Sequence, residues 1–221
     1  SLYIQRGERS GALSALVAKA KAAGAAIKEA DPRKLDHLCG GANHQGVVAQ
    51  IAAIGYVALQ DILDRVPDDE TPLIVVFDGV TDVRNFGAIA RSAECAGAHG
   101  VVIPKRRSAG LTSVVAKTSA GAVSHMKVAR VPNIPSLLKD LKKQGVWVFG
   151  TAANGTTGLY DTDLKGAAAI VIGSEGDGMT RLAAENCDFL VSIPMKGDLN
   201  SLNASASAAI LLYEAVRQRM N

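Results

Sequence analysis

The chain has 221 residues, of which 48% are hydrophobic and 20% charged, typical of one folded domain or of a domain with a smaller module. A net charge of +3 is too small to indicate a partner, and 4% aromatic residues are too few for a base-stacking platform. The sequence lacks an apolar stretch near the roughly 20 residues of a membrane span and a recognisable signal peptide, so we expect no contact with a membrane.

Three scattered cysteines, Cys39, Cys95 and Cys187, are odd in number and do not form the pattern of a disulfide framework. They favour a protein without disulfides in the reducing cytoplasm. No pair of cysteines or histidines has metal-ligand spacing, so we expect no bound metal.

Residues 1–66 are rich in alanine and glycine, with a helix predicted over 12–23 and a strand over 47–52. They offer little material for an independent core. We expect a small α/β domain that is incomplete at its N-terminus, because the chain begins with Ser1 and not with Met. The acidic, proline-bracketed residues 67–72 predict a linker.

Beyond residue 72, short apolar runs alternate with helical patterns. We expect strands over 73–77, 101–103, 127–131, 146–149, 168–172 and 189–193. We expect helices over 85–96, 111–119, 134–143, 180–187 and 203–219. Uniformly apolar strands that alternate with helices predict an α/β domain, 73–221, with a parallel sheet covered by helices on both faces.

Charge is unevenly distributed along this second domain. Residues 95–139 contain no Asp or Glu and seven basic residues. These are Lys105, Arg106, Arg107, Lys117, Lys127, Arg130 and Lys139. A stretch of one sign is either a surface that attracts phosphates or a solvated face without a partner, and charge alone does not choose between them.

Ligands of open parallel sheets bind beyond the carboxyl ends of the strands. The first such end, 77–87, leads into a helix that Asn85 is placed to cap. Arg91 lies further along this mostly apolar helix, where a guanidinium needs an anion or a carbonyl as partner, unless it is simply exposed.

Two further strand ends are rich in small residues. Gly150–Gly155 allows backbone groups to approach a flat ligand, although an ordinary turn has the same composition. Residues 170–179 read IVIGSEGDGM, a G-x-x-G-x-G order that is neither the dinucleotide fingerprint nor a phosphate-binding P-loop. Glu175, between these glycines, is either a helix-capping acid or a polar ligand contact.

The fourth strand end, 193–203, leads into a last helix that starts with small residues, SLNASASAA over 201–209. Asn203 can cap this helix, and the N–H groups at its start can hold a polar ligand. A tightly packed core helix is the other interpretation, but Ser201, Ser205 and Ser207 are poorer helix formers than alanine.

Together, three segments resemble the motifs of the SpoU/TrmH-type RNA ribose 2′-O-methyltransferases of the SPOUT superfamily. They are NFGAIAR over 85–91, IVIGSEGDGM over 170–179 and IPMKGDLNSLNAS over 193–205. Each alone is modest evidence, but all three in order are specific. The resemblance covers residues 73–221. Residues 1–66, with NHQGVVA over 43–49, resemble the end of the ribosomal-protein-like RNA-binding domain of the rRNA guanosine branch.

The resemblance implies a C-terminal trefoil knot, a homodimer, and S-adenosylmethionine as methyl donor without a metal. The implied donor-binding residues are Gly150, Thr151, Ala152, Gly173, Ile193, Met195, Ser201 and Leu202. The implied catalytic residues are Arg91, Asn85, Glu175, Ser201 and Asn203. A guanidinium is nearly always charged, so Arg91 suits a phosphate or a developing alkoxide better than the role of a base, in its own site or in the partner's.

The resemblance therefore predicts 2′-O-methylation of a ribose in RNA, most specifically of a guanosine in 23S rRNA. A tRNA or an rRNA adenosine remains open as the target, because the motifs bind the donor and a ribose and do not identify the base. A non-catalytic RNA-binding or ribosome-assembly protein of the same fold is a different alternative. A small-molecule binding module is disfavoured by the acid-free basic stretch.

Overall fold

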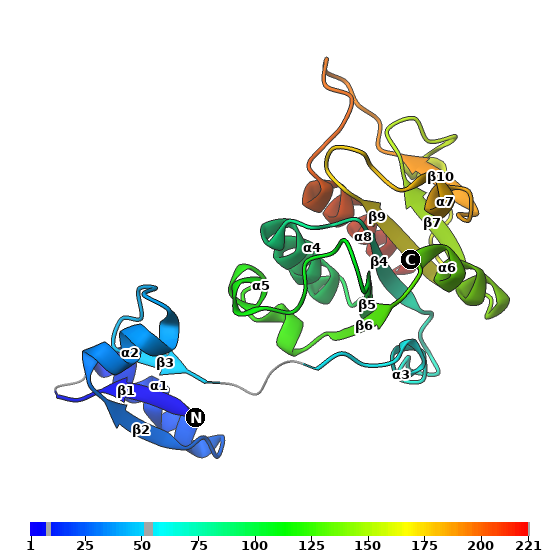
Figure 1. Ribbon diagram of the computed structural model, residues 1–221. Helices are drawn as coiled ribbons and strands as arrows, with labels where there is room; N and C mark the ends of the chain where they lie inside the picture. The colour runs from blue at the N-terminus through cyan, green and yellow to red at the C-terminus, as the bar shows by residue number, and fades with distance from the viewer. Residues whose placement is uncertain (8–9, 51–54, 221) are drawn as a thin grey trace. The chain divides into compact units, whose positions relative to one another are not determined.

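The computed structural model describes residues 1–7, 10–50 and 55–220. The chain divides into two compact units, Ser1–Ala53 and Ile54–Asn221 (Figure 1). Within the described residues, every helix is too short or too polar to cross a membrane.

The first unit is a three-stranded sheet with two helices. Strand β1 (Leu2–Gln5) lies in the centre, parallel to β2 (Ile27–Ala30) and antiparallel to β3 (Val47–Ala49). Helix α1 (Gly11–Ala22) precedes β2, and α2 (Pro32–Cys39) follows it. The predicted helix over 12–23 and the strand over 47–52 correspond to α1 and β3, although residues 51 and 52 lie outside the described part.

Alternation along β1 explains how so small a unit has a core. Leu2 and Ile4 pack with Val17 of α1, whereas Tyr3 between them packs with Leu35 of α2. Successive side chains of a strand point to opposite faces, so the side chains of this one short strand pack against both helices.

The second unit contains a seven-stranded sheet in which every pair of neighbours is parallel, in the order β6-β5-β4-β9-β7-β10-β8. The strands are β4 (Leu73–Asp78), β5 (Gly100–Pro104), β6 (Lys127–Val131), β7 (Trp147–Thr151), β8 (Thr157–Gly158), β9 (Ala168–Gly173) and β10 (Phe189–Ser192). The helices are α3 (Leu59–Leu63), α4 (Val83–Cys95), α5 (Ser113–Thr118), α6 (Ile134–Lys143), α7 (Arg181–Ala184) and α8 (Ala204–Arg219), with short 3-10 turns η1 (Ala122–Ser124) and η2 (Leu159–Asp161).

Helices cover both faces of this sheet (Figure 1). Val75 and Phe77 of β4 belong to the core with α4, α5 and α8, whereas Ile74 and Val76 belong to the core with α3, α6 and α7. Both faces of the central strands are therefore buried, as their uniformly apolar sequences require. The prediction of a parallel sheet with helices on both faces is confirmed.

The boundary between the units differs from the predicted one at residue 66. Ile62 of α3 is fully buried in the core of the second unit, and a Cβ at Gly100 would lie 2.6 Å from its Cδ1. Residues 67–72 are also bound to this unit, since the carbonyl of Pro72 accepts hydrogen bonds from Ala168 N and Arg219 Nη2. The structure thus assigns the described residues 55–72 to the second unit and not to a linker.

Two further predictions about helices are wrong in detail. Helix α4 begins at Val83 and is capped by Asp82, whose Oδ1 accepts a hydrogen bond from Arg84 N at 2.6 Å, so Asn85 is not the cap. Helix α7 spans four residues instead of the predicted 180–187, and Thr180 caps it. Asp82 lies three positions before Asn85 and competes with it for the cap of α4, and sequence spacing alone does not decide which one wins.

Candidate active site

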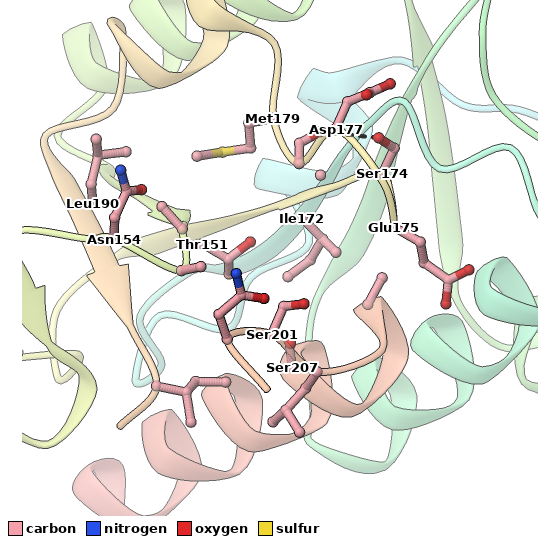
Figure 2. A pocket seen from close by; sticks show the side chains of 18 of the residues that line it. Thr151, Asn154, Ile172, Ser174, Glu175, Asp177, Met179, Leu190, Ser201 and Ser207 are labelled. Atoms are coloured by element: carbon pink, nitrogen blue, oxygen red, sulfur yellow. Dashed lines mark hydrogen bonds between the residues drawn. The ribbon is translucent and has the colours of Figure 1, made fainter. Parts of the chain in front are cut away.

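A cavity of about 440 Å³ opens where β7, β9 and β10 end (Figure 2). Because all seven strands are parallel, their carboxyl ends share one edge of the sheet, and the loops that follow them enclose the space. A cavity of this volume is in the range of small-molecule sites. Its lining includes Thr151, Ala152, Asn154, Gly173, Ser174, Glu175, Asp177, Met179, Ile193, Met195, Ser201, Leu202 and Ser207.

The loop after β9 folds back on itself beside the cavity. Ser174 N donates to Gly178 O at 2.9 Å, and Gly178 N donates to Ser174 O at 3.1 Å. A Cβ at Gly173 would lie 2.2 Å from the carbonyl carbon of Gly178 and 2.3 Å from Met179 N. Any larger residue at position 173 would therefore force this loop open.

Asp78, at the end of β4, fixes the far end of the same loop. Its Oδ2 accepts hydrogen bonds from Thr180 N at 2.6 Å and from Thr180 Oγ1 at 2.8 Å, and the residue is only 6% exposed. Asp78 is not among the site residues predicted from the sequence. An acid that ends a buried strand is the signal that could have found it, because a buried carboxylate requires donors.

Asn203 connects the three motif segments. Its Oδ1 caps α8 by accepting hydrogen bonds from Ser205 N at 2.9 Å and Ala206 N at 3.3 Å, as predicted. Its Nδ2 donates to Asn85 Oδ1 at 3.0 Å and also to Glu175 Oε1. Residues that are far apart in sequence are thereby held at the start of one helix, at the mouth of the cavity.

Most residues that the sequence indicated for donor binding lie around this cavity. Thr151, Ala152, Gly173, Ile193, Met195, Ser201 and Leu202 line it. Gly150 does not: a Cβ there would lie 2.6 Å from Met179 Cε and 2.7 Å from Cys187 Sγ. Gly150 therefore allows the wall behind the cavity to pack closely.

Of the other predicted residues, Glu175 and Ser201 line the cavity, and Asn85 reaches its edge through Asn203. Arg91 follows Asn85 on α4 by roughly one and a half turns. Its side chain is exposed, and it is not among the lining residues. Within one chain, the structure does not bring Arg91 to the other predicted catalytic residues.

The chemistry of the walls is mixed. Leu190, Ile193 and Leu202 offer apolar surface, whereas the loops after β7 and β9 offer backbone groups and the carboxylate of Glu175. Burial, with a contribution from nearby Asp188, raises the pKa of the Cys187 thiol to about 12, so it stays neutral behind the wall. Among the described residues, no three His, Cys, Asp or Glu side chains gather as metal ligands would.

Fold and site together define an α/β protein with a parallel sheet and a ligand cavity formed by the loops at its carboxyl edge. The sequence model of the SpoU rRNA Methylase family matches residues 72–213, and the model described as RNA 2′-O ribose methyltransferase substrate binding matches residues 1–57. The chain therefore belongs to the SpoU rRNA methylase family.

Curated relatives agree with this assignment. The chain is 43% identical over 219 residues to a putative TrmH family tRNA/rRNA methyltransferase, YacO, of Bacillus subtilis, covering 99% of this chain and 88% of the relative. It is 41% identical over 218 residues to the 23S rRNA (guanosine-2′-O-)-methyltransferase RlmB of Shewanella oneidensis, covering 99% and 89%. An uncharacterised tRNA/rRNA methyltransferase of Synechocystis is 46% identical over 201 residues, covering 90% of this chain, which spans only 52% of that relative.

Among solved structures, the SpoU methyltransferase AviRb from Streptomyces viridochromogenes, in complex with the cofactor AdoMet, superimposes with a TM-score of 0.78. The two chains are 30% identical, and the match covers 99% of this chain and 82% of AviRb. The similarity therefore includes both units and is not limited to the parallel sheet.

Proposed function

We propose that this protein methylates the 2′-hydroxyl of a ribose in RNA, with S-adenosylmethionine as the methyl donor. Membership of the SpoU family supports the reaction, and the similarity to AviRb with its bound cofactor supports the donor. The observation that carries the proposal is Asn203, which joins Asn85 and Glu175 beside a cavity of suitable size.

The cavity fits the donor chemically. Gly173 and the folded loop after it let backbone groups approach a ligand closely, while Ile193 and Leu202 provide surface for a flat ring. We assign donor binding to the seven predicted residues that line the cavity, from Thr151 to Leu202, and not to Gly150. When bound, S-adenosylmethionine supplies a methyl group attached to a positively charged sulfur.

A polar cluster at the mouth of the cavity, formed by Asn85, Asn203, Glu175 and Ser201, would then hold the ribose. The 2′-hydroxyl would have to lose its proton as the O–C bond forms and the C–S bond of the donor breaks, so its oxygen would have to lie in line with the methyl carbon and the sulfur. Asn85, Asn203, Glu175 and Ser201 orient the ribose and the donor's polar end. Arg91 fixes a phosphate and stabilises the developing alkoxide, which suits a permanently charged guanidinium.

We infer a homodimer in which Arg91 serves the partner's site. Two observations support this: Arg91 is exposed and outside its own cavity, and Tyr213 of α8 and Met220, which follows α8, are exposed. We also propose that the third-motif segment, 193–205, passes through the preceding loop in a trefoil knot. The small residues that begin within it, 201–209, would permit such a close passage.

A guanosine of 23S rRNA is the target that we propose, in the cytoplasm, because relatives at about 40% identity are named 23S rRNA (guanosine-2′-O-)-methyltransferases. Residues 1–57, matched by the substrate-binding model, would hold the RNA.

The test measures donor binding and reaction separately. Calorimetry should detect the association of S-adenosylmethionine with the purified protein, and labelled methyl groups should appear in 23S rRNA from a strain that lacks the protein. No heat of association at millimolar donor would refute the enzymatic function. If the protein binds the donor and the labelled methyl groups appear in tRNA but not in rRNA, the rRNA target is wrong and tRNA is the substrate.

A further inference from the structure

The proposed active site does not use the acid-free basic stretch, 95–139, and one loop of this stretch carries three adjacent cations. This is the loop Lys105–Leu111, which connects β5 to α5. Lys105, Arg106 and Arg107 are consecutive and exposed. They follow the carboxyl end of β5, so they lie at the same edge of the sheet as the cavity. Only β4 separates β5 from β9, a distance of roughly 10 Å at the usual strand spacing.

This basic loop is fixed on several sides. Lys105 N donates to Val131 O at 2.8 Å, and the carbonyl of Lys105 accepts from Arg130 Nη2 at 2.9 Å. At its other end, Ala109 N donates to Val80 O at 3.0 Å. Val80 lies in the β4–α4 connection, directly before the helix that carries Asn85 and Arg91.

Tyr56 also holds the basic loop in place. Its hydroxyl accepts a hydrogen bond from Leu111 N at 2.9 Å, and its ring stacks under the guanidinium of Arg130, whose carbon lies 4.7 Å from the ring centroid. Arg107 has φ = +56°, a conformation that a non-glycine residue keeps only where its surroundings fix it. The backbone that carries the three cations is thus held in place before any ligand arrives.

We propose that Lys105, Arg106 and Arg107 bind the phosphates of the RNA next to the target ribose, and that Tyr56 is the residue that positions them. This rests on the proposed function. Because the loop backbone is already ordered, phosphate binding by these cations costs side-chain freedom but little backbone freedom. They follow strand β5 at the same edge of the sheet as the residues that we propose to hold the ribose.

The test compares two triple variants of the full chain. Lys105→Ala/Arg106→Ala/Arg107→Ala removes the loop cations. Lys139→Ala/Lys143→Ala/Lys165→Ala removes the same charge from exposed residues elsewhere on this unit. Binding of a 23S rRNA transcript is measured over a range of salt concentrations, and donor affinity is measured by calorimetry without RNA.

The loop variant should reduce the slope of log K against log salt by about 2 to 3, roughly one for each phosphate contact. Its donor affinity should equal the wild type's. Equal slopes in the loop variant and the control variant would overturn the proposal, even if the wild type methylates RNA. If the triple variant does not fold, the single variants Lys105→Ala and Arg106→Ala test the proposal instead. Each should reduce the salt slope by about 1, and an unchanged slope in both would overturn the proposal.

Tyr56→Phe separates positioning from charge. The variant keeps the ring and all three cations but loses the hydroxyl that accepts from Leu111 N. RNA affinity should fall severalfold with an unchanged salt slope, because the number of phosphate contacts stays the same. Unchanged affinity in this variant would refute the role of Tyr56.

Discussion

The side chain of Asn203 donates a hydrogen bond to that of Asn85 across 3.0 Å, although the two residues are 118 positions apart. One amide thus does two things: its oxygen caps α8, and its nitrogen reaches the first and second motifs. The stability of the last helix and the geometry of the site therefore depend on the same side chain.

Substitution of Asn203 should separate these two effects. Serine also caps helices, so Asn203→Ser should keep most of the stability but lose the donor to Asn85 and Glu175. Asn203→Ala should lose both the cap and the donor, and loss of the cap should lower the free energy of unfolding by about 1 kcal/mol. Methyl transfer should fall strongly in both variants. Denaturant unfolding and turnover measure the two effects, and normal turnover in Asn203→Ser would contradict the assigned contact.

Arg91→Lys should lose most activity, about a hundredfold or more, while donor affinity is retained. Lysine keeps the charge but not the planar fork that holds a phosphate or an alkoxide in one geometry. Arg84→Lys, exposed on the same helix, serves as the control. Near-normal turnover of Arg91→Lys would remove this residue from the mechanism.

Mixing inactive variants tests whether Arg91 acts on the partner. If it does, mixed dimers of Arg91→Lys and Asn203→Ser contain one intact site, and random exchange should restore about a quarter of the wild-type activity. No recovery after confirmed exchange would place Arg91 in its own chain's site.

Gly173→Ala should weaken donor binding by at least tenfold. The added methyl group would meet backbone atoms at 2.2 Å and 2.3 Å, so the loop after β9 must move. Gly176 lies in the same loop, where a Cβ would have no neighbour within 4 Å, and Gly176→Ala should bind the donor nearly as the wild type does. Equal affinities in the two variants would show that loop closure does not matter for binding.

Glu214 should make stability depend on pH. Hydrogen bonds from Arg217 and then from Gln218 lower the pKa of this carboxyl to about 2 from its ordinary 4.5. Its contribution is fully present above pH 4.5 and is lost as the pH falls towards 2. The difference in unfolding free energy between wild type and Glu214→Gln should therefore shrink from pH 5 to pH 2. A difference that stays constant over this pH range would contradict the role of Glu214. Glu185→Gln, which removes the carboxylate of an exposed ion pair, is the control.

Local patterns predicted much of the second unit. Helix α6 has the predicted bounds, because Asn133 caps it, proline stands in its first turn and Leu137, Leu138 and Leu141 form one apolar stripe. In the first unit, β1, β2 and α2 were missed. They are short, and strand β1 is recognisable only from the partners on both of its faces.

The candidate site was partly predictable. The motif segments identified the lining of the cavity, since small residues after buried strands favour ligand sites. The close packing at Gly150 depends on Met179, which is distant in sequence, and the cap of α4 depends on Asp82, and not Asn85, accepting the hydrogen bond from Arg84 N. The contact between Asn85 and Asn203 depends on the strand order, which no periodicity encodes.

That strand order also affects how the chain reaches its native state. Strand β9 lies between β4 and β7, although both precede it in the sequence. A nascent chain that ends before Ala168 cannot pair the inner edges of these two strands, and their apolar faces stay uncovered during synthesis. Because such long-range pairing is slow and leaves strand edges exposed to aggregation, we expect ribosome-bound chains to depend on chaperones until β9 emerges.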